Sequence, residues 1–230
     1  AARIGALAVV ADVGIVGGVK AVVAAAVRGF GGVDVLVNNA GRWKQTPCDS
    51  GDREQALADF QEIFDTNAKG VYMLARAVVP SMIERSKDAG EGALGGNIVN
   101  ISTYYVLPPR PPEATGTNPP GTDLYAASKW ALNGFTQAWA LTLRPHRIRV
   151  NALAMGATDA PMLRNLFKQR GIDPPPADVV ATWMTRDEQA QLLVDLLAEG
   201  VDGRSGETIG SWVGEPVVLP PRRATGEPIV

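Results

Sequence analysis

The sequence predicts an α/β fold in which a doubly wound parallel sheet forms the middle of three layers, with helices on both faces. Short apolar runs, typical of strands buried on both faces, alternate with longer stretches whose apolar residues have helical spacing. This alternation indicates right-handed crossovers between parallel strands. With 230 residues and 46% hydrophobic content, the chain can bury one sizeable core, so we expect a single domain spanning residues 1–230.

The first strand, helix and strand are expected within the first forty or so residues. Residues 6–11 form a continuous apolar run, the pattern of a strand buried on both faces of a sheet. Residues 16–28 follow with helical spacing, and the glycines at positions 29, 31 and 32 end that helix. The next apolar run, residues 33–37, is expected to be the second strand.

The same alternation continues along the chain. We expect a long helix at residues 55–84, a strand at 97–101, a helix at 123–143 and a strand at 148–154. A last strand is expected at about residues 207–212. Each expected strand is thus separated from the next by a helix that can cross one face of the sheet.

Two proline-rich stretches, residues 108–120 and 174–176, must be loops, because proline continues neither a helix nor a central strand. The second stretch lies within residues 160–185, which we expect to form a substrate-binding lid. We hypothesise that the first stretch and residues 161–183 form walls of the substrate pocket.

Polar or glycine-containing segments follow several predicted strands. They are Asp12, residues 38–41, residues 102–103 and residues 155–158. In doubly wound sheets, ligands bind outside the carboxyl ends of the strands. We therefore expect these segments to contribute to one binding site.

Tyr125 and Lys129 are four residues apart in a predicted helix, so their side chains lie on one face about a turn from each other. A nearby ammonium stabilises a phenolate and lowers the tyrosine pKa toward the range of a general acid or base. The alternative is an ordinary exposed helical pair. The two residues taken alone favour that alternative.

Composition argues against several other classes of protein. The 22 basic residues are balanced by 24 acidic ones and form no basic block, which argues against nucleic-acid binding. One histidine and one cysteine argue against a metal site and exclude a disulfide within the chain. The apolar runs are too short to cross a bilayer and no leader peptide is recognisable. We expect a cytoplasmic protein without metal, membrane or nucleic-acid partners.

Four motifs give the tyrosine–lysine pair a context. In order they are VDVLVNNAG at residues 33–41, TNAKG at 66–70, NIVNIST at 97–103 and YAASK at 125–129. In sequence and order they resemble the short-chain dehydrogenase/reductase family, from about Ala6 to Met162 and more loosely beyond. The resemblance implies a Rossmann-like fold and an oxidoreductase that transfers a hydride between NAD or NADP and a secondary alcohol or ketone.

The same resemblance implies roles for the catalytic residues. Tyr125 would give or accept the proton, and Lys129 would lower its pKa and hold the nicotinamide ribose. Asn67 would anchor a water molecule that links Lys129 to solvent. Family members usually have two serines after the strand at 97–101, the second of which is catalytic. Here they are Ser102 and Thr103, so register favours Thr103 for holding the substrate oxygen, with Ser102 as the alternative.

The cofactor-binding residues also follow from the resemblance. Asp12 is placed like the family aspartate that accepts a hydrogen bond from the adenine, although an exposed carboxylate at a strand end is an equally good interpretation. Residues 155–162, MGATDAPM, match the stretch that holds the nicotinamide carboxamide, with Met155 in place of proline and Ala160 in place of threonine. The full expected set is Asp12, Val13, Asn39, Ala40, Gly41, Thr66, Tyr125, Lys129, Gly156 and Thr158.

One family feature is not found in the sequence. The glycine-rich TGxxxGxG turn should follow a first strand, yet only residues 1–5 precede the run at 6–11. Either this chain lacks the N-terminal strands, or the nucleotide is bound differently. We favour the first interpretation, because a sheet without its central strand exposes a wide apolar face. The residue that selects NAD or NADP lies in that region, so the sequence leaves both open.

Two other functions remain as alternatives. A lyase, epimerase or dehydratase of the same family keeps the tyrosine and lysine without net oxidation, and a dinucleotide sensor binds the cofactor without turnover. The long helices at residues 55–84 and 123–143 resemble those through which family members form dimers and tetramers. We therefore expect a homodimer or homotetramer that acts on a small-molecule alcohol or ketone.

Overall fold

The computed structural model describes residues 4–49, 51–88, 90, 92–107 and 121–211, and the backbone of residues 218–219. Its five-stranded sheet has the order β1-β2-β3-β4-β5. The first four strands are parallel, and β5 runs antiparallel to β4. The strands are β1 (Val35–Asn38), β2 (Gly96–Thr103), β3 (Ile148–Met155), β4 (Thr208–Ser211) and β5 (Val218–Leu219).

The strands are connected mainly by helices, as the sequence predicts. The α-helices are α1 (Val16–Phe30), α2 (Arg53–Phe64), α3 (Gly70–Asp88), α4 (Asp123–Leu143), α5 (Pro161–Gln169), α6 (Ala177–Val180) and α7 (Arg186–Ala198). Short 3-10 turns follow β2 and α4, at Tyr104–Val106 and Arg144–His146. The helix expected at 123–143 is confirmed at both ends.

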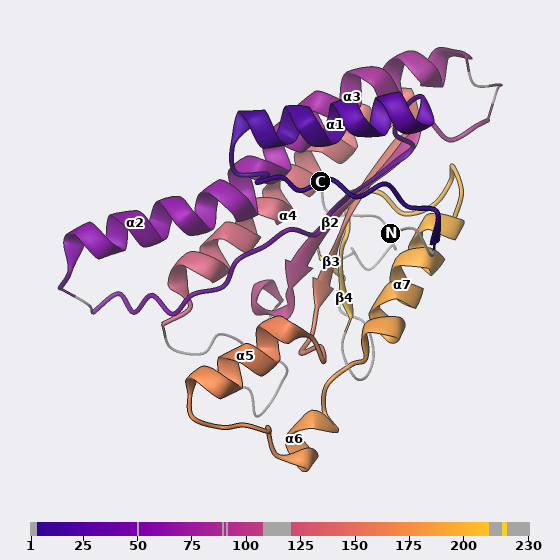
Figure 1. The fold of residues 1–230 in the computed structure, drawn as a ribbon. Helices are drawn as coiled ribbons and strands as arrows, with labels where there is room; N and C mark the ends of the chain where they lie inside the picture. The colour runs from indigo at the N-terminus through magenta and orange to yellow at the C-terminus, as the bar shows by residue number, and fades with distance from the viewer. Residues whose placement is uncertain are drawn as a thin grey trace.

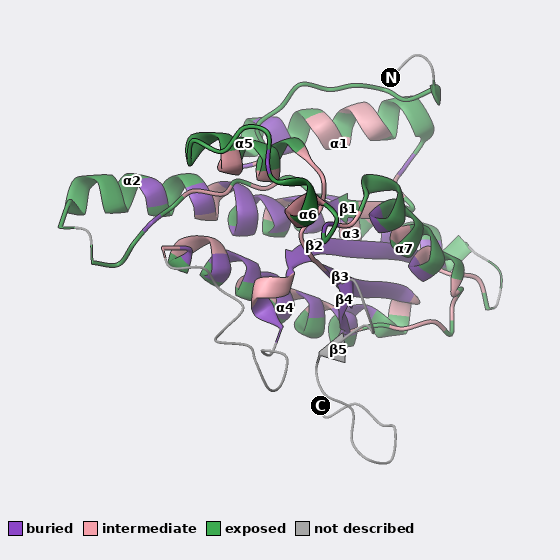
Figure 2. Ribbon diagram, turned by 90° about the horizontal axis from the view of Figure 1, so that it is seen from below, coloured by how far each residue is buried: buried purple, intermediate pink, exposed green. Residues whose placement is uncertain are grey.

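Helices cover both faces of the sheet, which confirms the three-layer α/β/α architecture. Because neighbouring strand residues point to opposite faces, Ile98 packs in a cluster with side chains of α3 and α4. Its neighbour Val99 packs in a second cluster with Leu196 of α7. Figure 1 shows α1 and α3 side by side at the top and α7 across the strands from them. Figure 2 shows that the central strands β2 and β3 are almost wholly buried between these layers.

The prediction of a strand at residues 6–11 is wrong. These residues are extended but pair with no described strand, and their side chains are exposed. A strand needs a neighbour that exchanges main-chain hydrogen bonds with it. β1, at the edge of the sheet, pairs with β2 and no other described strand. The apolar run at residues 6–11 predicted a buried strand, but no described strand lies next to it to form the hydrogen bonds.

The long helix expected at residues 55–84 is interrupted. α2 and α3 are joined by a π-helical turn, Asp65–Lys69. The chain stays helical there, but each main-chain hydrogen bond spans one residue more than in an α-helix. The turn contains the buried residues Thr66, Asn67 and Ala68. Such turns redirect side chains and are frequent at functional sites. The TNAKG motif therefore lies at the interruption of the expected helix, in the π-helical turn and the first residue of α3.

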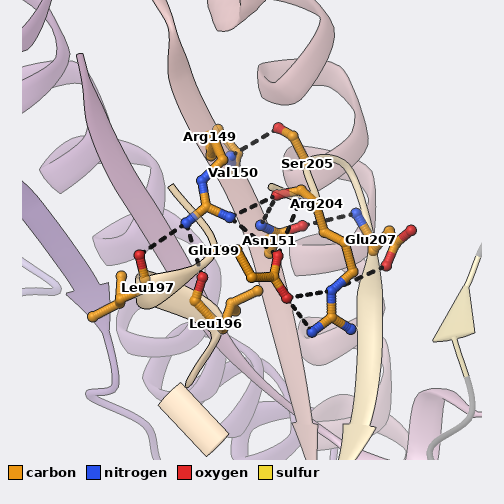
Figure 3. A network of polar contacts seen from close by, with 9 residues as sticks. All are labelled: Arg149, Val150, Asn151, Leu196, Leu197, Glu199, Arg204, Ser205 and Glu207. Carbon is orange, nitrogen blue, oxygen red and sulfur yellow. Dashed lines mark hydrogen bonds and ion pairs between the residues drawn. The ribbon is translucent and has the colours of Figure 1, made fainter. Parts of the chain in front are cut away.

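A buried polar network fixes the end of the sheet where β3 begins (Figure 3). Arg149 of β3 donates to the carbonyl oxygens of Leu196 (2.8 Å) and Leu197 (3.2 Å) at the end of α7. Its guanidinium also pairs with Glu199, whose carboxylate accepts hydrogen bonds from Arg204 in the loop before β4. The network thus joins α7 and the loop before β4 to β3.

Two expectations concern residues outside the described part of the chain. These are the proposed pocket wall at residues 108–120, and Trp212 at the end of the last expected strand. Among the described residues, none of the helices has the length and the apolar character needed to cross a membrane.

Candidate active site

A cavity of about 890 Å³ lies at the carboxyl ends of the central strands. In Figure 1, β2 and β3 point toward α5, which covers this end of the sheet. Nine of the expected site residues line the cavity: Asn39, Ala40, Gly41, Ser102, Thr103, Tyr125, Lys129, Gly156 and Thr158. Asp12, Val13, Thr66 and Asn67 do not line it. The fold therefore gathers most of the predicted set from four separate segments.

Tyr125 and Lys129 lie one turn apart on α4, as their spacing predicts. The Lys129 Nζ is 5.8 Å from the centroid of the Tyr125 ring and donates to the main-chain oxygen of Ile101, 2.8 Å away. Lys129 is only 4% exposed. The bond to β2 holds the ammonium beside the tyrosine inside the protein.

Burial sets the pKa of both groups. It raises the pKa of Tyr125 to about 12, although a hydrogen bond with the Thr103 side chain acts in the opposite direction. It lowers the pKa of Lys129 to about 8. In the protein alone, burial of Tyr125 therefore raises its pKa, and the group that acts against this is Thr103 and not Lys129, from which we expected the lowering.

Ser102 and Thr103 point to different partners, because they are neighbours on one strand. The side chain of Thr103 hydrogen-bonds Tyr125, whereas the Ser102 hydroxyl faces α4 and donates to the Lys129 carbonyl oxygen at 3.5 Å. Both residues are buried. The hydroxyl beside the tyrosine is thus that of Thr103.

Asn67 connects three segments behind the cavity. Its side-chain oxygen accepts from the Arg42 main-chain N–H (2.7 Å), and its amide donates to the Arg42 carbonyl oxygen (2.9 Å) and to Ser128 Oγ (3.0 Å). Ser128 in turn donates to the Tyr125 carbonyl oxygen at 2.7 Å. The π-helical turn places Asn67 where it can bind both the segment after β1 and the YAASK helix.

A second buried network aligns the strands that carry the site. Asn38 of β1 donates to the Asn100 side chain of β2 (2.8 Å), and Asn100 donates to Thr136 of α4 (2.9 Å). These amides tie the end of β1 and the middle of β2 to α4. The first asparagine of NNAG is therefore a structural residue, and the cavity is lined from Asn39 onward.

The nicotinamide half of a dinucleotide fits the residues around Tyr125. Gly41 passes close to Lys129: a side chain there would have its first carbon 3.4 Å from the Nζ and 3.6 Å from Asn67 Oδ1. A glycine lets the backbone approach a ligand in this space. Gly156 and Thr158 line the same cavity and follow β3, whereas Gly41 follows β1, on the other side of β2. Donors and acceptors for a ribose and a carboxamide thus flank the tyrosine.

The segment expected to contact the adenine lies outside the cavity. Asp12 is exposed, and its carboxylate accepts from the main-chain N–H of Gly14 at 2.8 Å. The carbonyl oxygen of Val13 lies 3.0 Å from the position that a Gly70 side chain would occupy. A side chain at Gly14 would have its first carbon 3.3 Å from the Asp65 carbonyl oxygen, so the Asp12–Gly14 turn packs on the π-helical turn. Its role toward a cofactor remains a prediction.

Apolar and aromatic side chains form the remaining walls. Tyr105 packs edge-on against Tyr125, with ring centroids 5.9 Å apart, and Trp43 faces the same cavity. From α5, the wall is formed by Pro161, Met162, Leu163 and Leu166. Within the described residues, no group of three or more histidine, cysteine, aspartate or glutamate side chains could hold a metal ion.

Comparison with known proteins gives a match to one sequence family. Residues 1–171 match the sequence family described as short chain dehydrogenase. The chain belongs to the short-chain dehydrogenase family. The match covers β1 to β3 and every segment that contributes a proposed catalytic residue.

Curated members of the short-chain dehydrogenase family share about a third of the aligned residues with this chain. An uncharacterised oxidoreductase of Escherichia coli, YohF, is 29% identical over 183 residues, which cover 80% of this chain and 64% of YohF. A 3-alpha-(or 20-beta)-hydroxysteroid dehydrogenase of Mycobacterium bovis is 34% identical over 177 residues, or 74% of this chain and 60% of that enzyme. The chain thus spans less than two thirds of the length of these relatives.

Solved structures show the same short-chain dehydrogenase fold. The structure of a 3-ketoacyl-(acyl-carrier-protein) reductase from Brucella melitensis complexed with NADH aligns with a TM-score of 0.71 at 31% identity. The alignment covers 90% of this chain and 77% of the reductase. The Rossmann-like fold expected from the sequence is therefore confirmed.

Ser128 and Gln189 are among the polar residues of the site that were not predicted. Ser128 is fully buried and three residues after Tyr125, a spacing that places both on one side of the helix. Gln189 lines the cavity and is the one polar residue in the stripe formed by positions 189, 193 and 196 of α7. In both cases a small or neutral polar residue at a core position is the signal that could have revealed them.

Proposed function

We propose that this short-chain dehydrogenase transfers a hydride reversibly between NAD or NADP and a secondary alcohol or ketone. The observation that carries the proposal is the grouping around Tyr125, which has the Thr103 hydroxyl as a hydrogen-bond partner and the Lys129 ammonium beside its ring. Both neighbours lie in a cavity large enough for a nicotinamide and a substrate together.

Several residues would hold the cofactor. Residues 39–41 follow β1, and Gly156 and Thr158 follow β3, on the two sides of β2, to which Lys129 is bonded. When bound there, a nicotinamide ring supplies the hydride or accepts it. The fit supports NAD and NADP equally, because the described residues around the cavity do not include those that would meet the adenosine ribose.

Tyr125 moves the substrate proton in this proposal. In oxidation, the alcohol gives its O–H proton to the Tyr125 phenolate, and the carbinol C–H bond breaks with its electron pair leaving as hydride, so that a C=O bond forms. In reduction, the Tyr125 hydroxyl returns the proton to the oxygen. Thr103 orients that oxygen by a hydrogen bond, and its contact with Tyr125 favours it over Ser102 for this role.

Lys129 and Asn67 support the proton transfer. The Lys129 ammonium stabilises the phenolate when it forms and offers donors to a nicotinamide ribose. Asn67 fixes the Arg42 backbone and Ser128 on the two sides of this pair. We propose that a water molecule held beside Asn67 links Lys129 to solvent.

The walls favour a moderately large apolar or aromatic substrate. Tyr105 and Trp43 provide aromatic faces, and Met162 and Leu163 of α5 provide an apolar cover. We propose that residues 160–185 act as the substrate-binding lid. The name of the related hydroxysteroid dehydrogenase describes a substrate of this general size and character.

We also propose a cytoplasmic homodimer or homotetramer that assembles through α2, α3 and α4. These helices carry exposed large apolar side chains at Leu57, Phe60, Tyr72, Trp130 and Leu141. A surface of this kind is typical of a contact between protein chains. Light scattering at increasing protein concentration tests the assembly, and a particle with the mass of one chain throughout would contradict it.

A spectroscopic assay tests the proposed reaction. The protein is incubated with NAD or NADP and a panel of cyclic and aromatic secondary alcohols, and the absorbance of the reduced nicotinamide is followed. We expect reduced cofactor to accumulate in step with ketone. Turnover of substrate without a net change in cofactor would favour a lyase or epimerase, and binding without turnover would favour a sensor.

A further inference from the structure

Gln189, near the start of α7, is buried where the helix otherwise presents apolar residues to the core. It is 3% exposed. It lies in the same stripe as Leu193 and Leu196, which pack in the cluster under β3 and β4. Burying an amide is unfavourable unless it is hydrogen-bonded. An apolar residue would fill this position without that requirement, so the contacts of the amide need an explanation.

The Gln189 amide is fully used by partners from three segments. Its Nε2 donates to Thr158 Oγ1 at 3.1 Å and contacts Met184 Sδ at 3.3 Å. Its Oε1 accepts from Ser211 Oγ, at the end of β4, at 2.7 Å. One side chain thus joins the loop after β3, the end of the lid segment and the last parallel strand.

Main-chain hydrogen bonds meet at the same place. The Met184 N–H donates to the Ala157 carbonyl oxygen (2.8 Å), and the Asp159 N–H donates to the Met184 carbonyl oxygen (2.9 Å). The Gly156 N–H donates to the Ser211 carbonyl oxygen at 2.8 Å. The segment 160–183, which contains α5 and α6, therefore leaves and returns to the body of the protein at one point, beside Gln189.

The contact also fixes what Thr158 can do. Its hydroxyl donates to the Gly156 carbonyl oxygen at 2.9 Å and accepts from Gln189. A hydroxyl has one donor and two acceptor positions. Within the described part of the chain no residue uses the remaining acceptor, so a donor inside the cavity that Thr158 lines can take it. The amide N–H of a nicotinamide carboxamide is a donor of this kind.

We propose that Gln189 is a positioning residue for the cofactor site: it holds Thr158 as a hydrogen-bond acceptor toward the nicotinamide carboxamide and fastens the base of the lid. The inference rests on the proposed function. In that function, Gln189 contacts neither the substrate oxygen nor Tyr125. It acts through Thr158 and Met184.

The test compares Gln189→Met with Gln191→Met. Methionine keeps the length of glutamine and removes its hydrogen bonds. Gln191 lies on the exposed side of the same helix, where its amide bonds Asp195. We expect Gln189→Met to raise the dissociation constant and the KM for the cofactor about tenfold, the equivalent of one lost hydrogen bond, and to change kcat much less. Gln191→Met should leave all three unchanged.

Cofactor affinity is measured by titration without substrate, so that it does not depend on turnover. Equal dissociation constants in the two variants would overturn the role of Gln189, and the proposed reaction would stand if the wild type still oxidises alcohols. A wild type that binds cofactor but never turns over would contradict the reaction. A tenfold difference in affinity between the variants would still support the role of Gln189.

A milder variant covers the case in which Gln189→Met does not fold. Ser211→Ala removes the hydrogen bond that holds Gln189 Oε1 and leaves the contact with Thr158 in place. We expect it to weaken cofactor binding about threefold and to speed hydrogen exchange at the Asp159 and Met184 amides. Unchanged affinity together with unchanged exchange at those amides would contradict the proposal.

Discussion

Tyr125 and Lys129 show how the interior of the protein sets the chemistry of single residues. The spacing of the two residues predicted that they share one face of a helix, and they do. Their pKa values could not be predicted from spacing, because burial depends on β2 and on the segments that close the cavity. Ser128 escaped prediction for a similar reason, since its partner Asn67 is brought to it by the π-helical turn.

The buried Lys129 carries a cost in stability that its proposed function explains. A pKa lowered from 10.5 to about 8 corresponds to about 3 kcal/mol against the charged form. Lys129→Met removes this charge but leaves the Ile101 carbonyl oxygen without its donor, which costs about 1 kcal/mol. We therefore expect Lys129→Met to raise the free energy of unfolding by about 1–2 kcal/mol at pH 6 while abolishing turnover.

The pH dependence makes this prediction specific. Between about pH 8 and pH 10.5 the unfolded chain binds more protons at Lys129 than the folded protein, so wild-type stability gains as pH rises through this range. The advantage of Lys129→Met should be full below about pH 8 and lost by about pH 10.5. Urea unfolding across this range measures it, and a difference that does not vary with pH would contradict burial as its cause.

At the scale of elements, regular segments were predicted well and the connections between them poorly. The helix at 123–143 was predicted at both ends because its apolar spacing is uninterrupted. The run at residues 6–11 had an equally clear pattern, yet strand formation also needs a neighbouring strand. The π-helical turn left no signal in the apolar spacing, because it adds a single residue within a continuous helical segment.

Two adjacent glycines of α1 test how the Asp12–Gly14 turn is held. A side chain at Gly18 would place its first carbon 1.9 Å from the Asp12 carbonyl oxygen, whereas Gly17 has nothing within 4 Å. We expect Gly18→Ala to lower the free energy of unfolding by about 2 kcal/mol or more, because the turn must move. Gly17→Ala should raise it by up to about 1 kcal/mol, the usual gain in helix propensity.

Chemical denaturation of the two alanine variants gives both values. If the Asp12–Gly14 turn takes part in cofactor binding, Gly18→Ala should also weaken cofactor affinity and Gly17→Ala should not. Equal stability of the two variants would show that the turn does not pack on α1 in the way that the structure describes.

The Arg149 network makes a second prediction at the scale of elements. Burial raises the pKa of Glu199, but hydrogen bonds and charges from Arg204 and Arg149 outweigh it and lower the pKa overall. Arg149 is 4% exposed in its side chain and Glu199 is 24% exposed. Glu199→Gln leaves the buried guanidinium without its counter-charge, and we expect it to lower the free energy of unfolding by about 2–3 kcal/mol.

Glu84→Gln is the matched control, because Glu84 forms an exposed ion pair with Lys87. We expect it to change stability by less than about 0.5 kcal/mol. The effect of Glu199→Gln should also shrink as pH falls, since the stability that the ionised Glu199 contributes is present above its ordinary pKa and is lost on protonation. Similar effects of the two substitutions would contradict a structural role for the Arg149 network.

For the whole molecule, the sequence predicted the architecture and most of the residues around one cavity. It did so because parallel strands bring their carboxyl ends to one edge, so that short motifs far apart in the chain meet there. It did not predict Gln189, whose partners lie in three different segments. Contacts of that kind depend on how the segments pack and not on local spacing.

The sheet is less covered at its β1 edge than at its centre. Val35 and Val37 of β1 are 39% and 36% exposed, on the side away from Leu36, which packs with the cluster under α3. The extended residues 6–11 are exposed as well. The open part of the molecule is therefore the edge next to β1, and the cavity around Tyr125 extends to this edge, because Val37 lines it.

The most direct test of the account is Tyr125→Phe, which removes one hydroxyl and keeps the ring that packs against Tyr105. If Tyr125 exchanges the substrate proton, turnover with a nicotinamide cofactor should fall by about a thousandfold or more, within the range of a general acid or base. The dissociation constant for the cofactor should change less than about twofold, because the ring and Lys129 remain. A variant that oxidises its alcohol at the wild-type rate would contradict the central claim.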